Sequence, residues 1–141
     1  MLRTILSIAG RPGLYKLISQ GKNMIVVESL TDGKRAPVYA HEKVISMGDI
    51  AIYTIGQEVP LRVVFKSIAE KENNSTVSIS LKVNKAMAAY FAEVLPTYDR
   101  ERVYPNDIKK VLSWYNALLN AGITDFEDKE ENSSEENQEN Q

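Results

Sequence analysis

Few residues of this chain have the chemistry that catalysis needs. There is one histidine, His41, and there is no cysteine among the 141 residues. Nucleophilic catalysis needs a serine or a thiol beside a base, and no nucleophile motif accompanies His41. Without thiolates, a disulfide framework and a cysteine metal site are excluded as well. We therefore interpret His41 as a turn or surface residue.

Carboxylates and glycines give no enzymatic signature either. Glu28, Asp32, Glu42 and Asp49 lack the paired spacing of an acid/base or metal site, and solvated turns explain them better. The stretch GRPG lacks the lysine and the spacing of a P-loop, and no G-x-G-x-x-G motif occurs. The sequence thus predicts a protein that is not an enzyme and that holds no metal or cofactor.

Aromatic side chains offer a binding chemistry instead. Tyr15, Tyr39 and Tyr53 each lie in a segment that reads as a β-strand. Rings at one mouth of a small β-barrel can stack on a flat ligand or enclose a cation. The alternative is that these are ordinary core or surface tyrosines of strands. We take all three as candidate partner-binding residues.

Basic residues form a second candidate set. Lys22, Lys34, Arg35 and Lys43 lie in predicted loops of the same barrel, where they could contact phosphates. The basic excess is nevertheless small, because residues 1–123 carry 16 Lys and Arg against 11 Asp and Glu. This is well short of the strongly basic character of a dedicated nucleic-acid binder.

The first 56 residues predict the β-structure that would position these side chains. The segments rich in β-forming residues are TILSIAG, GLYKLISQ, NMIVVESL, APVYA and DIAIYT. Breaks such as Gly21-Lys22-Asn23 and Asp32-Gly33-Lys34 are short enough for hairpin loops. Five short strands joined by tight turns predict an antiparallel SH3-like or Tudor-like barrel, because an open sheet would leave two exposed edges. An open meander sheet is the alternative.

From residue 59 the apolar spacing becomes helical, and residues 59–122 predict a three-helix unit. The apolar arcs are Leu61, Val64, Phe65 and Ile68, then Met87, Tyr90, Phe91, Val94 and Leu95, then Ile108, Val111, Leu112, Tyr115, Leu118 and Leu119. Asn106 is the expected N-cap of the third helix, and Trp114 lies at the edge of its apolar arc. The expected fold class is α+β, with an interface between two parts that are each too small to be stable alone.

The last 18 residues have a different composition. Residues 124–141 carry eight acidic residues and one lysine, and they show no apolar periodicity. Such a segment cannot bury enough surface to offset its ordering entropy, so we predict a disordered acidic tail that is dispensable for folding. Its net charge opposes that of residues 1–123, so it could compete for a basic face.

The beginning of the chain shows no targeting signal. MLRTILSIAG is apolar but too short for a signal peptide or a membrane span. The sequence therefore predicts a cytoplasmic protein.

Two segments carry a resemblance to a known family. MLRTILSIAGRPGLYKLISQGKNMIVVESLTDGKR and YFAEVLPTYDRERVYPNDIKKVLSWYNALL resemble a family of small uncharacterised proteins of Bacteroidetes-type bacteria, defined as a domain of unknown function. The similarity runs to about residue 121 and leaves the acidic tail outside. It implies a bacterial cytoplasmic origin, no known enzyme activity, and a Tudor/SH3-like part followed by a helical part.

These observations favour a non-enzymatic binding or adaptor module that acts on another protein or on a protein–RNA assembly. The alternative is a nucleic-acid-binding protein with an autoinhibitory acidic tail. An adaptor should have a contiguous apolar patch outside its core, whereas a nucleic-acid binder should have one basic face with exposed rings.

Overall fold

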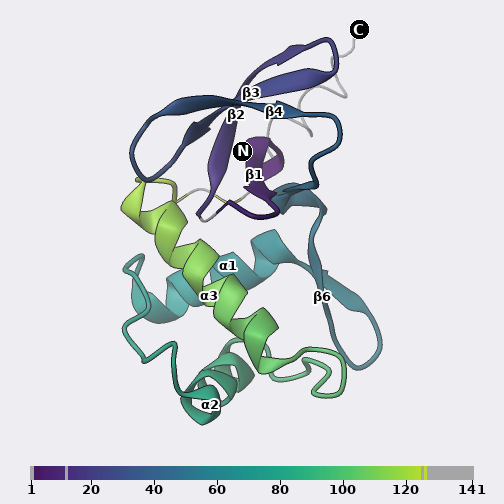
Figure 1. Ribbon diagram of the computed structural model, residues 1–141. Helices are drawn as coiled ribbons and strands as arrows, with labels where there is room; N and C mark the ends of the chain where they lie inside the picture. Colours follow the sequence, from purple (N-terminus) through teal and green to yellow (C-terminus); the bar gives the residue numbers. More distant parts are fainter. Residues whose placement is uncertain (1, 12, 125, 127–141) are drawn as a thin grey trace, which may run out of the picture.

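The computed structural model describes residues 2–11, 13–124 and 126. A β-sheet occupies one end of the molecule and the helices occupy the other, with the β6 hairpin projecting to one side (Figure 1). The elements are η1 (Leu2–Thr4), β1 (Ile5–Ile8), β2 (Tyr15–Gly21), β3 (Met24–Ser29), β4 (Arg35–Tyr39), β5 (Val44–Ser46), η2 (Met47–Asp49), β6 (Ala51–Tyr53), β7 (Glu58–Pro60), α1 (Leu61–Glu72), α2 (Asn84–Val94) and α3 (Pro105–Asn120), where η denotes a 3-10 helix.

The large sheet is antiparallel throughout, in the order β4-β3-β2-β1-β5. Its hairpins turn where the sequence predicts. Lys22 and Asn23 join β2 to β3, and Asn23 adopts the left-handed φ of 66° that this tight loop requires. In the turn from β3 to β4 the Asp32 carboxylate accepts the Lys34 N–H at 3.0 Å. Both hairpin predictions are confirmed.

The sheet is open, so the predicted SH3-like or Tudor-like barrel is wrong. The fifth strand of the sheet is β5, and the segment DIAIYT instead supplies β6, which pairs with β7 in a separate two-stranded sheet. The cause lies in η2, directly after β5. Met47 is fully buried in the core, and a Cβ on Gly48 would lie 2.7 Å from Cγ of Arg3. This close packing turns the chain away from the sheet before β6 begins.

The two edges of the open sheet are protected from pairing with another chain. Exposed edges, the reason for expecting a closed barrel, are therefore avoided without closure. On β4, Pro37 has no N–H, and its carbonyl accepts a hydrogen bond from the Arg11 guanidinium at 3.3 Å. Arg11 also pairs with Glu42 at 2.9 Å. On the other edge, β5 is only three residues long. Prolines, charged side chains and short strands all limit pairing with another chain.

One hydrophobic core joins the sheet to the helices. Leu2, Ile5, Leu14 and Met47 are fully buried in the same cluster as residues of all three helices. A smaller cluster, consisting of Leu6, Ile8, Val27 and Val38, fills the sheet itself. Because side chains alternate along a strand, β1 contributes to both clusters. The expected interface between the two parts is therefore confirmed.

The three predicted helices are present, and their apolar arcs are buried or partly buried. The start of α3 differs from the prediction. Its first residue is Pro105, and the Asp107 carboxylate reaches back to accept the Tyr104 N–H at 3.0 Å. Proline suits the first helical position because that N–H needs no partner. The predicted N-cap at Asn106 is therefore wrong.

The chain reverses direction after α3 and places the ring of Phe126 in the core. Gly122 has φ 81°, and the N–H of Ile123 donates to the Leu118 carbonyl at 2.8 Å. Phe126, which the sequence assigns to the acidic tail, is 4% exposed. Its ring centroid lies 5.4 Å from that of Phe65 and 6.1 Å from that of Tyr115. Residue 125 and residues 127–141 of the predicted tail lie outside the described residues.

We expect the ring of Phe126 to stabilise the fold. Phe126→Ala, or truncation after Ile123, should lower the free energy of unfolding by about 3 kcal/mol, as for other buried phenylalanines. Truncation after Phe126 is the matched control and should leave the stability unchanged. Urea unfolding followed by Trp114 fluorescence measures all three. Equal stability of residues 1–123 and residues 1–126 would contradict the role of this ring.

We also expect Gly48 to tolerate no side chain. In Gly48→Ala the new Cβ would lie 3.1 Å from Cα of Arg3, and crowding of this kind typically costs about 1–3 kcal/mol. Gly21→Ala is the matched control, because the nearest atom to its Cβ would be Sδ of the flexible Met24 side chain at 3.1 Å, and the backbone would stay at an ordinary contact distance of 3.6 Å. Thermal unfolding of both variants tests the prediction. A Gly48→Ala protein as stable as Gly21→Ala would show that the contact between η1 and η2 is loose.

Candidate functional site

The three candidate tyrosines lie in different parts of the fold. Tyr15 pairs with one end of β3, and Tyr39 pairs with the other end. The Tyr39 ring stacks on His41, with centroids 6.3 Å apart and ring planes 4° apart. Tyr53 belongs to β6, in the other sheet. The structure therefore does not bring these rings together into one cage.

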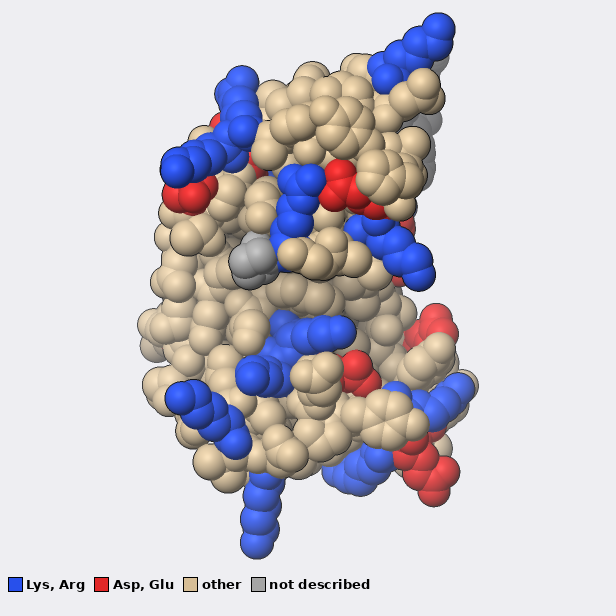
Figure 2. All heavy atoms as spheres, viewed as in Figure 1, with Lys and Arg blue, Asp and Glu red and all other residues tan. Residues whose placement is uncertain are grey.

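The four candidate basic residues are divided in the same way. Lys22 lies in the turn before β3 and Lys43 directly before β5, whereas Lys34 and Arg35 lie near the far end of β3. Arg35 pairs with Glu28 at 3.1 Å. In the view of Figure 2, basic side chains are dispersed over both the sheet and the helical half, with other residues between them. This face of the molecule presents no continuous basic patch.

His41 lies on an exposed turn between β4 and β5. The neighbouring Glu42 carboxylate accepts the Tyr39 N–H at 3.1 Å and pairs with Arg11, and these two contacts hold the pKa of Glu42 below its usual value. This arrangement fastens a turn. Within the described part of the chain, no group of three or more His, Asp or Glu side chains is arranged to hold a metal ion.

A mainly apolar groove of about 300 Å³ lies between β6 and α3. We call it the β6–α3 groove, and its lining consists of Ile45, residues 50–53, Arg102, Val103, and Asp107, Lys110, Val111 and Trp114 of α3. Ile52, Val103 and Val111 are buried beneath it. Ile45 and Tyr53 remain 53% and 41% exposed, and Trp114 is half-buried. The groove thus combines a rigid apolar floor with accessible apolar walls.

Side chains on one face of α3 form one wall of the groove. Asp107, Lys110, Val111 and Trp114 recur at three- and four-residue intervals, so they share one face of the helix. The sequence predicts that Trp114 packs between α3 and a neighbouring element. In the structure Trp114 packs partly buried against the core, and its remaining surface faces the groove.

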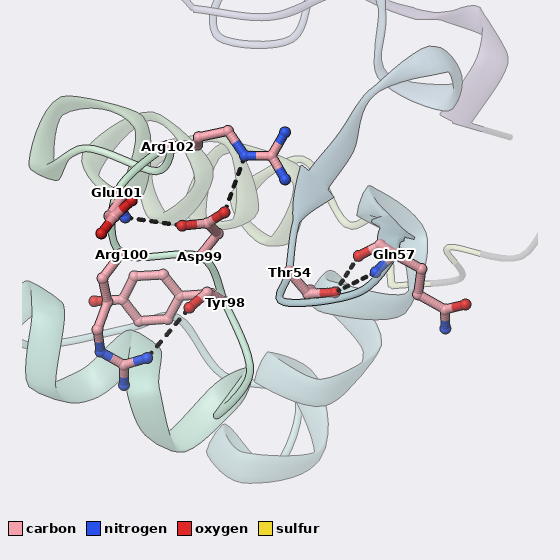
Figure 3. A network of polar contacts seen from close by, with 7 residues as sticks. All are labelled: Thr54, Gln57, Tyr98, Asp99, Arg100, Glu101 and Arg102. Carbon is pink, nitrogen blue, oxygen red and sulfur yellow. Dashed lines mark hydrogen bonds and ion pairs between the residues drawn. The ribbon is translucent and has the colours of Figure 1, made fainter.

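The segment before α3 supplies lining residues on the opposite side of the groove. The Ile55 N–H donates to the Thr97 carbonyl, and the Asp99 N–H donates to the Tyr53 carbonyl, both at 2.9 Å. Residues 97–99 therefore extend the β6–β7 hairpin. Figure 3 shows that the Thr54 hydroxyl bonds the Gln57 carbonyl, which closes the hairpin tip. These contacts bring Arg102 and Val103 to the groove.

The charged groups of Asp99, Arg100 and Arg102 make contacts within the protein. Arg102 donates from Nε to the Asp99 carboxylate at 2.9 Å (Figure 3). This pair, together with the Glu101 N–H, lowers the pKa of Asp99. The Arg102 guanidinium also lies 4.3 Å from the Tyr53 ring centroid. Arg100 lies 4.5 Å from the Tyr98 ring centroid. Arg102 is therefore held in one orientation at the groove rim.

Lys110 is the second cation of the rim. No described carboxylate lies within ion-pair distance of its side chain. The Asp107 carboxylate, one turn earlier on α3, accepts the Tyr104 N–H. Of the residues that line this groove, the sequence analysis identifies only Tyr53 as a candidate binding residue. The available signal is Trp114, a large ring at the edge of a helical arc.

The sequence and structure also match known proteins. Residues 2–47 match a family model described as a domain of unknown function (DUF5606), and residues 50–118 match a second domain of unknown function (DUF6852). None of the curated proteins matches. No helix in the described part of the chain combines the length and the apolar character that crossing a membrane requires.

A solved relative covers nearly the whole chain. It is the solution NMR structure of a Bacteroides vulgatus protein, a structural genomics target, with 60% sequence identity and a TM-score of 0.75. The match covers 89% of this chain and 91% of that chain. The boundary between the two domain models falls at η2, where the chain leaves the sheet. This chain therefore belongs to the same family as the Bacteroides vulgatus protein, and in this chain the segments that match DUF5606 and DUF6852 follow one another within a single fold.

Proposed function

We propose that this protein is a non-enzymatic binding module that docks an apolar segment of another protein in the β6–α3 groove. The observation that carries the proposal is the position of Ile45, Tyr53 and Trp114. These large apolar side chains surround one groove outside the core and keep part of their surface accessible. Aromatic anchors over a desolvated apolar floor are typical of interface hot spots.

The backbone around the groove favours docking by side chains over addition of a strand. β6 pairs with β7 on one side, and the Tyr53 carbonyl and the Ile55 N–H are bonded to residues 97–99. The edge that strand addition requires is thus occupied at this position. An amphipathic helix or a short peptide that inserts apolar side chains fits this arrangement better.

The nucleic-acid alternative has less support. A nucleic-acid binder needs basic residues gathered on one face. The basic side chains visible in Figure 2 are dispersed, and Arg11, Arg35 and Arg102 are paired with carboxylates. Because a contiguous apolar patch distinguishes an adaptor, the β6–α3 groove favours the protein-binding function.

We expect peptides selected by the wild-type protein from a displayed random 12-residue library to depend on the groove. Ile45→Lys and Tyr53→Lys should each weaken their binding about tenfold, because a charge replaces an accessible apolar wall. Val83→Lys, at a side chain that is 49% exposed outside the groove, is the matched control and should have little effect. Synthetic peptides without tryptophan make Trp114, the single tryptophan, the reporter of binding. Peptides that bind all three variants equally would refute the proposal.

A salt titration tests the nucleic-acid alternative. We expect neither the full chain nor residues 1–126 to bind single-stranded or duplex oligonucleotides at about 50 mM salt. Residues 1–126 keep the buried Phe126 and remove the acidic segment beyond it. Binding by the shortened chain alone, lost as the salt concentration rises, would favour a nucleic-acid binder with an autoinhibitory tail.

A further inference from the structure

We propose that the segment docked in the β6–α3 groove carries a carboxylate next to its apolar anchor, and that Lys110 and Arg102 bind this carboxylate. The partner is thus an acidic amphipathic peptide segment of another protein. This inference rests on the proposed function, since it names the chemistry of the ligand for the same site. It adds a charge requirement that apolar docking alone would not impose.

The groove rim has two cations with donors that bind no described carboxylate, namely the terminal nitrogens of Arg102 and the Lys110 ammonium. Arg102 uses its Nε for Asp99 at 2.9 Å, and its two terminal nitrogens make no other hydrogen bond to the described residues. Lys110 has no carboxylate partner among those residues. A carboxylate can accept from both cations, and the planar guanidinium of arginine suits it particularly well.

The carboxylates near the groove already accept hydrogen bonds from the protein itself. The two Asp99 oxygens accept the Glu101 N–H and Arg102 Nε, each at 2.9 Å. The Asp107 carboxylate accepts the Tyr104 N–H in the first turn of α3, where the helix dipole stabilises negative charge. A lysine on the partner would compete with these contacts for the acids and would meet Lys110 and Arg102. This asymmetry selects an acidic segment.

Arg102 is ordered before any partner arrives. Its pairing with Asp99 and its position 4.3 Å above the centre of the Tyr53 ring fix the guanidinium beside an apolar wall. A charge that is already oriented loses less side-chain entropy on binding, so more of its interaction appears as affinity. The apolar anchor of the partner would then contact Tyr53, and its carboxylate would contact the neighbouring Arg102.

The acidic end of this chain is a poor occupant of the same groove. Residues 127–141 contain seven acids but no apolar residue. This segment has the charge that the cations attract, yet it has no side chain to cover Ile45 or Trp114. A segment of another protein that combines both features satisfies the site more completely.

The test uses three synthetic peptide pools of 12 residues that share two apolar positions with helical spacing. The positions flanking these anchors are all Glu in one pool, all Gln in the second and all Lys in the third. We expect the full chain to bind the Glu pool about tenfold more tightly than the Lys pool at 50 mM salt, as two partly exposed charge pairs allow. The difference should shrink at about 500 mM salt, because ions screen exposed charges.

Charge reversal on α3 supplies the decisive variant. Lys110→Glu should reverse the preference and favour the Lys pool. Lys109→Glu is the matched control, since this neighbouring residue is also exposed but lies outside the groove lining. It should keep the preference for the Glu pool. Thermal unfolding verifies that both variants are folded. The same preference in Lys110→Glu and in the wild type would overturn the inference.

Two further outcomes separate this inference from the proposed function. If all three pools bind the wild type equally and Ile45→Lys still weakens binding, the carboxylate requirement is refuted while the apolar docking function stands. If no pool binds and no displayed peptide depends on the groove, the proposed function itself fails. A Glu preference that appears only in residues 1–126 would identify the acidic end of this chain as the occupant of the rim, which would overturn the partner assignment.

Discussion

The close packing of the two short 3-10 helices, η1 and η2, determines how the rest of the molecule is arranged. Ser46 links them, because its hydroxyl donates to the Arg3 carbonyl at 2.8 Å and accepts the Gly48 N–H at 3.2 Å. Leu2 and Met47, one from each helix, are completely buried in the main core. Tight, non-polar packing of this kind allows little relative movement. The packing of η1 against η2 therefore fixes the junction at which the chain passes from the sheet to the helices.

The position of the groove follows from this junction. Once η2 has turned the chain away from the sheet, β6 pairs with β7 and can no longer extend the five-stranded sheet. The Ile50 carbonyl then accepts the N–H of Leu61, the first residue of α1, at 2.9 Å. The hairpin is thereby held next to the helices, and the space between β6 and α3 becomes the β6–α3 groove. The same junction separates the segments matched by the two family models.

Ion pairs elsewhere in the described molecule join one part of the fold to another. At the groove rim, by contrast, one of the two cations has no described carboxylate partner. Ion pairs such as Arg11 with Glu42 and Arg35 with Glu28 fasten turns and strand edges, and exposed pairs of this kind contribute little to stability. At the groove, Arg102 combines an ion pair with a ring contact, while Lys110 has no carboxylate partner among the described residues. We therefore propose that charge at this site has a greater role in selecting a partner than in holding the fold.

Local patterns in the sequence determined the hairpin turns and the buried faces of the three helices. Turn geometry depends on a few adjacent residues, as at Asn23, and a helical arc depends on side chains three or four residues apart. The tertiary structure alone decided that the sheet stays open, that Phe126 returns to the core, and that Ile45, Tyr53 and Trp114 surround one groove. These features join residues that are far apart in the chain. They depend on the packing of Gly48 against Arg3 and of Phe126 against Phe65, which no local periodicity encodes.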